Sequence, residues 1–138
     1  MNPTEQARNI FAADRYATEL SGIAIEHVGL HEAFCLMPLD IRHRNARGVA
    51  MGGALFTLAD FAAAVAANSE CLDDGNLRWV SLDATIHYLS PALGDRLAAS
   101  AKAIKTGRST ALYQTTIENP DNGKTIAIVE TTMMRIES

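Results

Sequence analysis

The chain has 138 residues, of which 48% are hydrophobic and 20% are charged, so it can bury the core of one globular domain. Its formal net charge of −4 leaves no excess of lysine and arginine to neutralise a phosphate backbone, which argues against a nucleic-acid partner. The sequence shows neither a signal-like start nor an apolar run near the roughly 20 residues that cross a bilayer, so we expect a cytoplasmic protein without membrane contact.

The first 21 residues have the pattern of a helix. Asn2, Pro3 and Glu5 stand where an N-cap, a first helical residue and a capping-box partner belong. Apolar residues then follow at helical spacing as far as Leu20, and Ser21 with Gly22 ends the pattern. We therefore predict an N-terminal helix over 1–21, followed by the main body of a single domain over 22–138.

Residues 53–67 form the most apolar segment of the chain. Short strand-like runs over 23–38, broken near Gly29, and a polar, basic loop over 40–48 precede it. Within the segment only Thr57 and Asp60 are polar, and a helix that is apolar on every side is a buried helix. Its alanines would allow other backbone elements to approach closely.

The remainder of the chain reads as antiparallel strands separated by turns. The predicted strands cover 79–89, 97–104, 109–118 and 125–135. In the first of these, simple alternation places Ser81 on the polar face and Leu82 on the apolar face. The predicted fold is therefore α+β, an antiparallel sheet wrapped around a long central helix.

Asp60 is a carboxylate in the middle of this apolar helix. An unpaired buried charge costs several kcal/mol, so the position needs a reason. One interpretation is a general base or nucleophile with a shifted pKa. The other is a purely structural residue at the edge of the protein, paired with an arginine or a backbone amide.

Gly52 and Gly53 stand at the head of the same helix. Free N–H groups there, unobstructed by side chains, would form an oxyanion hole, although the pair could also serve only for a tight turn or close packing. Gly53 and Asp60 lie about 10 Å apart along the axis, too far for one helix to bring both to one carbonyl group. We therefore predict an obligate homodimer with shared active sites, in which Gly53 of one subunit faces Asp60 of the other.

The segment 43–60 (HRNARGVAMGGALFTLAD) closely resembles the hotdog thioesterases of the phenylacetate-degradation (PaaI-like) type, whose pattern is Asn, Gly, His-Gly-Gly and Leu-Ala-Asp. The likeness continues through 80–92, 94–95 and 107–108, and it covers nearly all of 22–135. The resemblance implies the hotdog fold and hydrolysis of acyl-CoA thioesters. Dimers in that family often pair into tetramers, so a tetramer is also compatible.

The resemblance assigns roles to four catalytic candidates. Asp60 would be the nucleophile or the base that activates water, and the Gly53 N–H would polarise the thioester carbonyl. Asn45 would help to orient the carbonyl or the water. Ser81 matches a position that assists the attacking water, but only a strand end or a bulge would reconcile this role with the predicted polar face.

The candidate substrate contacts are Gly52, Met51, Thr57, Arg47 and Arg108. The two arginines would bind phosphates of coenzyme A, and Arg108 ranks first because it matches the basic residue that follows a glycine in the family. Met51 departs from the family, which usually has a histidine there. If that histidine only supports the loop, activity survives its absence; if it positions the substrate, the protein is slow or specialised.

Two competing functions stay open. Met51 is compatible with a non-catalytic acyl-CoA-binding module, although a mere binder has little use for Asp60 beside an acyl chain. A hotdog dehydratase or hydratase would need a histidine paired with the helix carboxylate, and only His43 could fold back to supply it. Cys35 and Cys71 fit no zinc pattern and read as buried thiols. We expect no metal site and no cofactor, since coenzyme A is part of the substrate.

Overall fold

The computed structural model describes residues 1–136, and its strands form one six-stranded antiparallel sheet in the order β1-β2-β4-β5-β6-β3. The strands are β1 (Ala24–Gly29), β2 (Glu32–Pro38), β3 (Trp79–Tyr88), β4 (Arg96–Thr106), β5 (Thr110–Glu118) and β6 (Thr125–Arg135). The predicted strands are confirmed to within two residues at their ends. β1 and β3 are the edges of the sheet.

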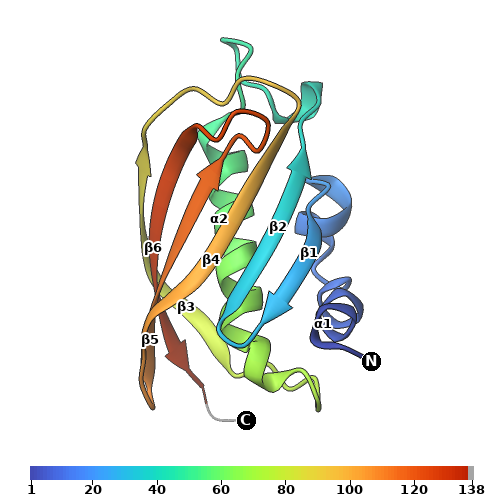
Figure 1. Cartoon of the computed structure of the whole chain (residues 1–138), viewed down its shortest axis with the longest axis vertical. Helices are drawn as coiled ribbons and strands as arrows, with labels where there is room; N and C mark the ends of the chain where they lie inside the picture. Colours follow the sequence, from blue (N-terminus) through green and yellow to red (C-terminus); the bar gives the residue numbers. More distant parts are fainter. Residues whose placement is uncertain (137–138) are drawn as a thin grey trace.

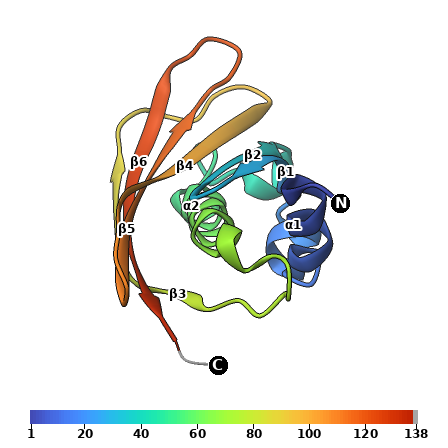
Figure 2. The same ribbon diagram turned by 60° about the horizontal axis from the view of Figure 1, so that its bottom comes forward.

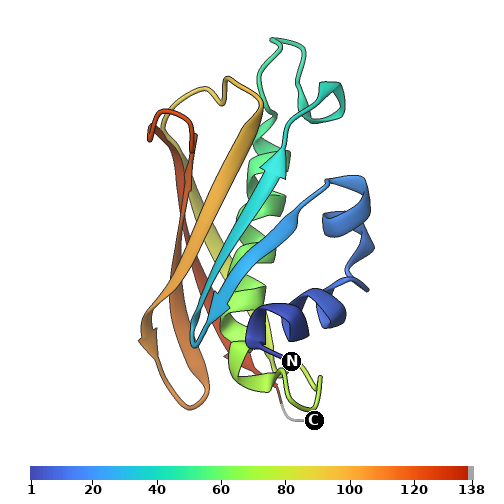
Figure 3. The same cartoon turned by 45° about the vertical axis from the view of Figure 1, so that its right-hand side comes forward.

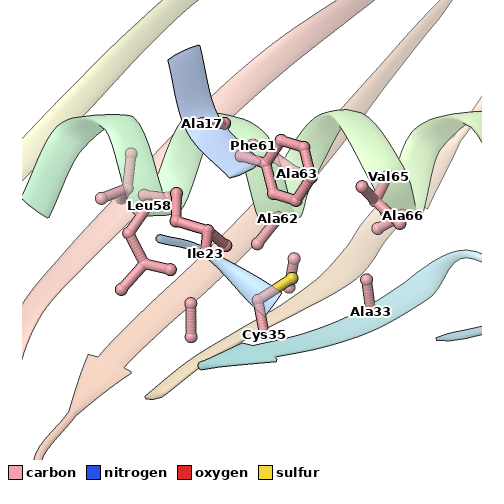
Figure 4. Packing of buried hydrophobic residues seen from close by; sticks show 14 of the residues in the cluster. Ala17, Ile23, Ala33, Cys35, Leu58, Phe61, Ala62, Ala63, Val65 and Ala66 are labelled. Atoms are coloured by element: carbon pink, nitrogen blue, oxygen red, sulfur yellow. The ribbon is translucent and has the colours of Figure 1, made fainter. Parts of the chain in front are cut away.

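The sheet curves around helix α2 (Gly52–Ala67), which runs along its concave face (Figures 1 and 2). This confirms the predicted arrangement of an antiparallel sheet around one long central helix. Alanines make the close approach possible, since Ala59, Ala62, Ala63 and Ala66 are completely buried. Figure 4 shows the small side chains of α2 packed with Cys35 of β2.

One stripe of α2 is not covered, which corrects the expectation of a helix buried on every side. Gly53 is exposed, and Thr57, Asp60 and Ala64 are only half-buried. These positions recur at spacings of three or four residues, so they share one face of the helix. The two polar side chains of the helix therefore lie on its accessible face.

The N-terminal segment forms two helical pieces rather than one helix. Helix α1 (Pro3–Phe11) is followed by a turn and by a short π-helical segment, η1 (Tyr16–Leu20). On one regular helix Phe11 and Ala17 would point about 120° apart, whereas the break allows both side chains to be buried. The predicted N-cap is confirmed, because the Asn2 side chain accepts a hydrogen bond from the Glu5 N–H at 2.9 Å. Figure 3 shows both pieces beside β1 and α2.

Asn68, a buried residue just beyond α2, attaches the start of β3 to the helix. Its Oδ1 accepts hydrogen bonds from the N–H groups of Arg78 and Trp79, each at 3.0 Å. Its Nδ2 donates to the carbonyls of Ala64 and Trp79 at 2.9 and 3.1 Å. The amide uses donors and acceptors at once, so it fixes where β3 begins relative to α2.

Both cysteines are free and buried, as predicted, and burial raises the pKa of the Cys35 thiol to about 12. Within residues 1–136 no helix is long and apolar enough to cross a membrane.

Candidate active site

The start of α2 presents two free backbone donors. Met51 is the N-cap residue, and its carbonyl accepts hydrogen bonds from the N–H groups of Ala54 and Leu55 at 3.0 and 3.3 Å. The N–H groups of Gly52 and Gly53 have no hydrogen-bond partner within residues 1–136, and no side chain caps the helix. Free donors at the positive end of a helix dipole favour a negatively charged ligand atom.

The two glycines are needed for different reasons. A Cβ atom on Gly52 would lie 3.0 Å from Tyr88 Oη and 3.1 Å from Tyr88 Cζ, so the tyrosine must shift before a side chain fits there. A Cβ atom on Gly53 would meet nothing within 4 Å. The close-packing interpretation thus holds for Gly52 alone, and the space in front of Gly53 is open.

Asp60 is half-buried on the same stripe of α2. Its Oδ1 accepts a hydrogen bond from the Ser81 hydroxyl at 3.3 Å. Burial raises the pKa of the Asp60 carboxyl above its ordinary value; the Ser81 hydrogen bond opposes this, and the negative charge of Asp14 adds to it. Among the described residues no cation forms an ion pair with Asp60, so the arginine-paired structural interpretation finds no support.

A β-bulge brings Ser81 to Asp60. The pairing of β3 with β6 shifts between Ser81 and Asp83, which leaves Leu82 as the extra residue. Ser81 pairs with buried Met133 and therefore faces the helix, together with Ala84, Ile86 and Tyr88. The simple alternation that placed Ser81 on the polar face was wrong, because it assumed an unbroken strand.

A cavity of about 400 Å³ opens beside Gly53. Met51, Gly53 and Thr57 line it from α2 and its N-cap, which brings three predicted site residues together. Tyr16 and Leu20 line it from η1, with 64% and 62% of their surfaces exposed. The sequence prediction missed both residues as site residues, because no pattern in the chain shows that η1 packs beside the start of α2.

The accessible stripe of α2 therefore carries a half-buried carboxylate and a free N–H, and Ser81 of β3 and a cavity lie beside it. A family model described as "Thioesterase superfamily" matches residues 47–126, which include all of α2 and β3. The chain belongs to the thioesterase superfamily. Family membership places it among the thioester hydrolases.

Known relatives support this assignment. This chain is 32% identical over 109 residues to the acyl-coenzyme A thioesterase PaaI of Escherichia coli, and the match spans 77% of this chain and 74% of that protein. A protein of Archaeoglobus fulgidus is 38% identical over 95 residues, and the match spans 68% of this chain and 58% of that protein.

The fold agrees with the sequence matches. The solved structure of the E. coli PaaI protein matches with a TM-score of 0.84 and 29% identity, over 99% of this chain and 98% of that chain. The resemblance to PaaI-like hotdog thioesterases is thereby confirmed.

His43 lies beside this site in the thioesterase but has a structural role. Its Nδ1 accepts a hydrogen bond from the Asp40 N–H at 3.1 Å, and its Nε2 lies 2.7 Å from the Ser21 carbonyl. Both nitrogens of the buried ring are occupied, so His43 offers no free group for the proton transfers of a dehydratase.

Asn45 and Arg47 belong to the loop before α2. The Asn45 Oδ1 accepts hydrogen bonds from the N–H groups of Arg47 and Val49 at 2.9 and 3.3 Å, which shapes the loop and leaves the amide nitrogen for another partner. Arg47 lines a second cavity of about 690 Å³ between this loop and residues 88–93. Neither side chain contacts Asp60 within the described part of the subunit.

Arg108 lies far from these groups in the same subunit. It is exposed in the turn between β4 and β5, at the end of the molecule where α2 terminates. The start of α2 is at the opposite end (Figures 1 and 3). One subunit therefore does not bring Arg108 together with Gly53.

Proposed function

We propose that the chain hydrolyses acyl-CoA thioesters to a free acid and coenzyme A, with Asp60 as the catalytic carboxylate. The observation that carries the proposal is the geometry of Asp60. It is half-buried, it has no cationic partner among residues 1–136, it accepts a hydrogen bond from Ser81, and it shares an accessible stripe with the N–H of Gly53. The relatives named as acyl-coenzyme A thioesterases support the substrate class.

In the proposed reaction the Gly53 N–H donates to the thioester oxygen as negative charge develops on it. Asp60 either removes a proton from the attacking water or attacks the carbonyl carbon itself, forming a mixed anhydride that water then opens. In both cases the carbon–sulfur bond breaks, and the CoA thiolate leaves and takes up a proton. Ser81 holds the Asp60 carboxylate, and Asn45 offers its amide nitrogen to the carbonyl or the water.

The proposed site is shared between two subunits. Gly53 and Asp60 are seven residues apart on one helix, about 10 Å along its axis. The edge strand β3 supports a partner close to both groups, because it exposes Val80, Leu82 and Leu89 with 39%, 56% and 55% of their surfaces accessible in and just beyond the strand. We propose a homodimer with two equivalent sites, and pairing of dimers into tetramers as a further step.

The same proposal covers the rest of the substrate. We propose that Arg47, which lines the cavity beside the start of α2, binds a phosphate of coenzyme A. Arg108, at the far end of its own subunit, would contribute to a site only through the partner. The proposed reaction uses water and the substrate alone, without a metal or a separate cofactor, and we propose a cytoplasmic location for it.

The test is release of CoA from aryl and alkyl thioesters such as phenylacetyl-CoA and hexanoyl-CoA. Asp60→Asn keeps the shape of the side chain and removes the base, so we expect a loss of roughly 10²-fold or more in kcat. Asp83→Asn is the matched control, because Asp83 is an exposed carboxylate of β3 that points away from α2. Binding of acyl-CoA without hydrolysis by the wild type would instead favour the non-catalytic module.

Subunit mixing tests the shared site. Gly53→Ala and Asp60→Asn each damage every site of their own homodimers. If each site combines Gly53 of one subunit with Asp60 of the other, a mixed dimer has one intact site and one doubly damaged site. Co-expression should then restore about a quarter of the wild-type activity for random pairing. No recovery above the two separate variants would refute the shared site.

A further inference from the structure

Tyr88, the last residue of β3, contacts the start of α2. Its hydroxyl donates a hydrogen bond to the Gly52 carbonyl at 3.1 Å, and its ring fills the space that a side chain on Gly52 would need. Both residues also line the cavity of about 690 Å³. Tyr88 is thus the residue of β3 that fixes the first turn of the helix.

The acceptor of this hydrogen bond is part of the proposed oxyanion donor. The Gly52 carbonyl and the Gly53 N–H are the two ends of one planar peptide group. A hydrogen bond to the oxygen draws electron density through the amide and makes the N–H at its other end a stronger donor. It also fixes the plane of the peptide and hence the direction of the N–H bond.

The bulge at Leu82 makes this contact compatible with the one at Asp60. Ser81 and Tyr88 are seven positions apart, so on an unbroken strand they would point to opposite faces. The pairing shift lets both face α2, since Ser81 pairs with Met133 and Tyr88 with Ala127, and both partners are buried. One strand therefore holds both the carboxylate and the peptide group on which the proposed reaction depends.

We propose that the Tyr88 hydroxyl orients and polarises the 52–53 peptide group as the donor to the thioester oxyanion. The inference rests on the proposed function, in which the Gly53 N–H stabilises that charge. Tyr88 acts through the peptide group and does not touch the reacting carbonyl, so it is a positioning residue. Its contribution is greatest in the transition state, where the charge on the oxygen is greatest.

Tyr88→Phe removes only the hydroxyl and keeps the ring against Gly52. The first measurement is nuclear magnetic resonance of the whole protein without ligand, following the Gly52 carbonyl carbon and the Gly53 amide proton. Loss of the hydrogen bond should shift both signals upfield. Tyr113→Phe, at a buried tyrosine of β5 outside the site, should leave them unchanged. Unchanged signals in Tyr88→Phe would overturn the inference whether or not the protein is a hydrolase.

The second measurement is kinetic, with phenylacetyl-CoA and hexanoyl-CoA. Tyr88→Phe should lower kcat by roughly 3- to 10-fold with KM nearly unchanged, as expected for one hydrogen bond that strengthens in the transition state. Site-specific 3-fluorotyrosine at position 88 should raise kcat near neutral pH, because fluorine makes the phenol a stronger donor. A residue that serves only to pack would not respond to the acidity of its hydroxyl.

The outcomes separate this inference from the proposed function. An active wild type with an unaltered kcat in Tyr88→Phe would overturn the inference and leave the hydrolase intact. A wild type that hydrolyses neither probe would overturn the proposed function and the inference together. Altered signals, a lower kcat in the phenylalanine variant and a higher kcat in the fluorinated one would establish the positioning role.

Discussion

Alanine at position 53 should separate stability from activity. Gly53 does not have a positive φ, and a Cβ atom there meets nothing within 4 Å, so Gly53→Ala is sterically free in the folded chain. Because alanine has fewer conformations than glycine in the unfolded state, we expect the free energy of unfolding to rise by about 0.4–1 kcal/mol. The added methyl group would occupy the space through which a thioester oxygen reaches the N–H. We expect kcat/KM to fall by roughly 10- to 10³-fold.

Gly52→Ala is the matched control, one residue away on the same helical turn. Its Cβ atom would lie 3.0 Å from Tyr88 Oη, so the tyrosine must move. We expect its free energy of unfolding to lie about 0.5–1.5 kcal/mol below that of Gly53→Ala, because the displaced Tyr88 loses its hydrogen bond to the Gly52 carbonyl. Urea unfolding and CoA release measure the two quantities on the same samples. A Gly53→Ala variant with wild-type kcat/KM would refute the assignment of the Gly53 N–H to the oxyanion.

Three further predictions follow from the same contacts. Because burial raises the pKa of Asp60, the rise of kcat/KM with pH should have its midpoint above the pKa of an ordinary carboxyl. Asp14→Asn should move this midpoint to lower pH, because the negative charge of Asp14 also raises the pKa. A midpoint at the ordinary carboxyl pKa would contradict the burial argument. Urea unfolding of Asp60→Asn should show higher stability than wild type at neutral pH. This difference should shrink as the pH falls through the raised pKa of Asp60 and vanish below its unfolded value. His43→Ala, which leaves Ser21 and Asp40 without their partner, should lower the urea-unfolding free energy by about 2–4 kcal/mol, and a smaller loss would show that the loop relaxes.

The secondary-structure elements were predictable because hydrophobic periodicity is local. The apolar run at 53–67 and the alternation at 79–89 predicted the positions of α2 and β3 almost residue for residue. The prediction of one continuous N-terminal helix was wrong because the break depends on contacts with the core that local periodicity does not show. Its apolar residues fit helical spacing up to Leu20, but Phe11 and Ala17 must both reach the core, and that requirement breaks the helix.

The site was predictable in part. Asp60 stood out as a carboxylate in an apolar helix, and Gly53 as a glycine at its head, so two groups of the proposed mechanism were evident from the chain alone. Tyr16 and Tyr88 carried no such signal. Their proximity to the start of α2 depends on how η1 and β3 pack against the helix.

The sequence by itself determined which residues have chemistry to offer, because polarity and periodicity are properties of neighbouring positions. Only the tertiary structure decided which of them meet. Ser81 and Tyr88 both face α2 because β3 pairs with β6 in a shifted register, and the residues that set this register are remote in the sequence. A single extra residue at the bulge turns a side chain from one face of a strand to the other.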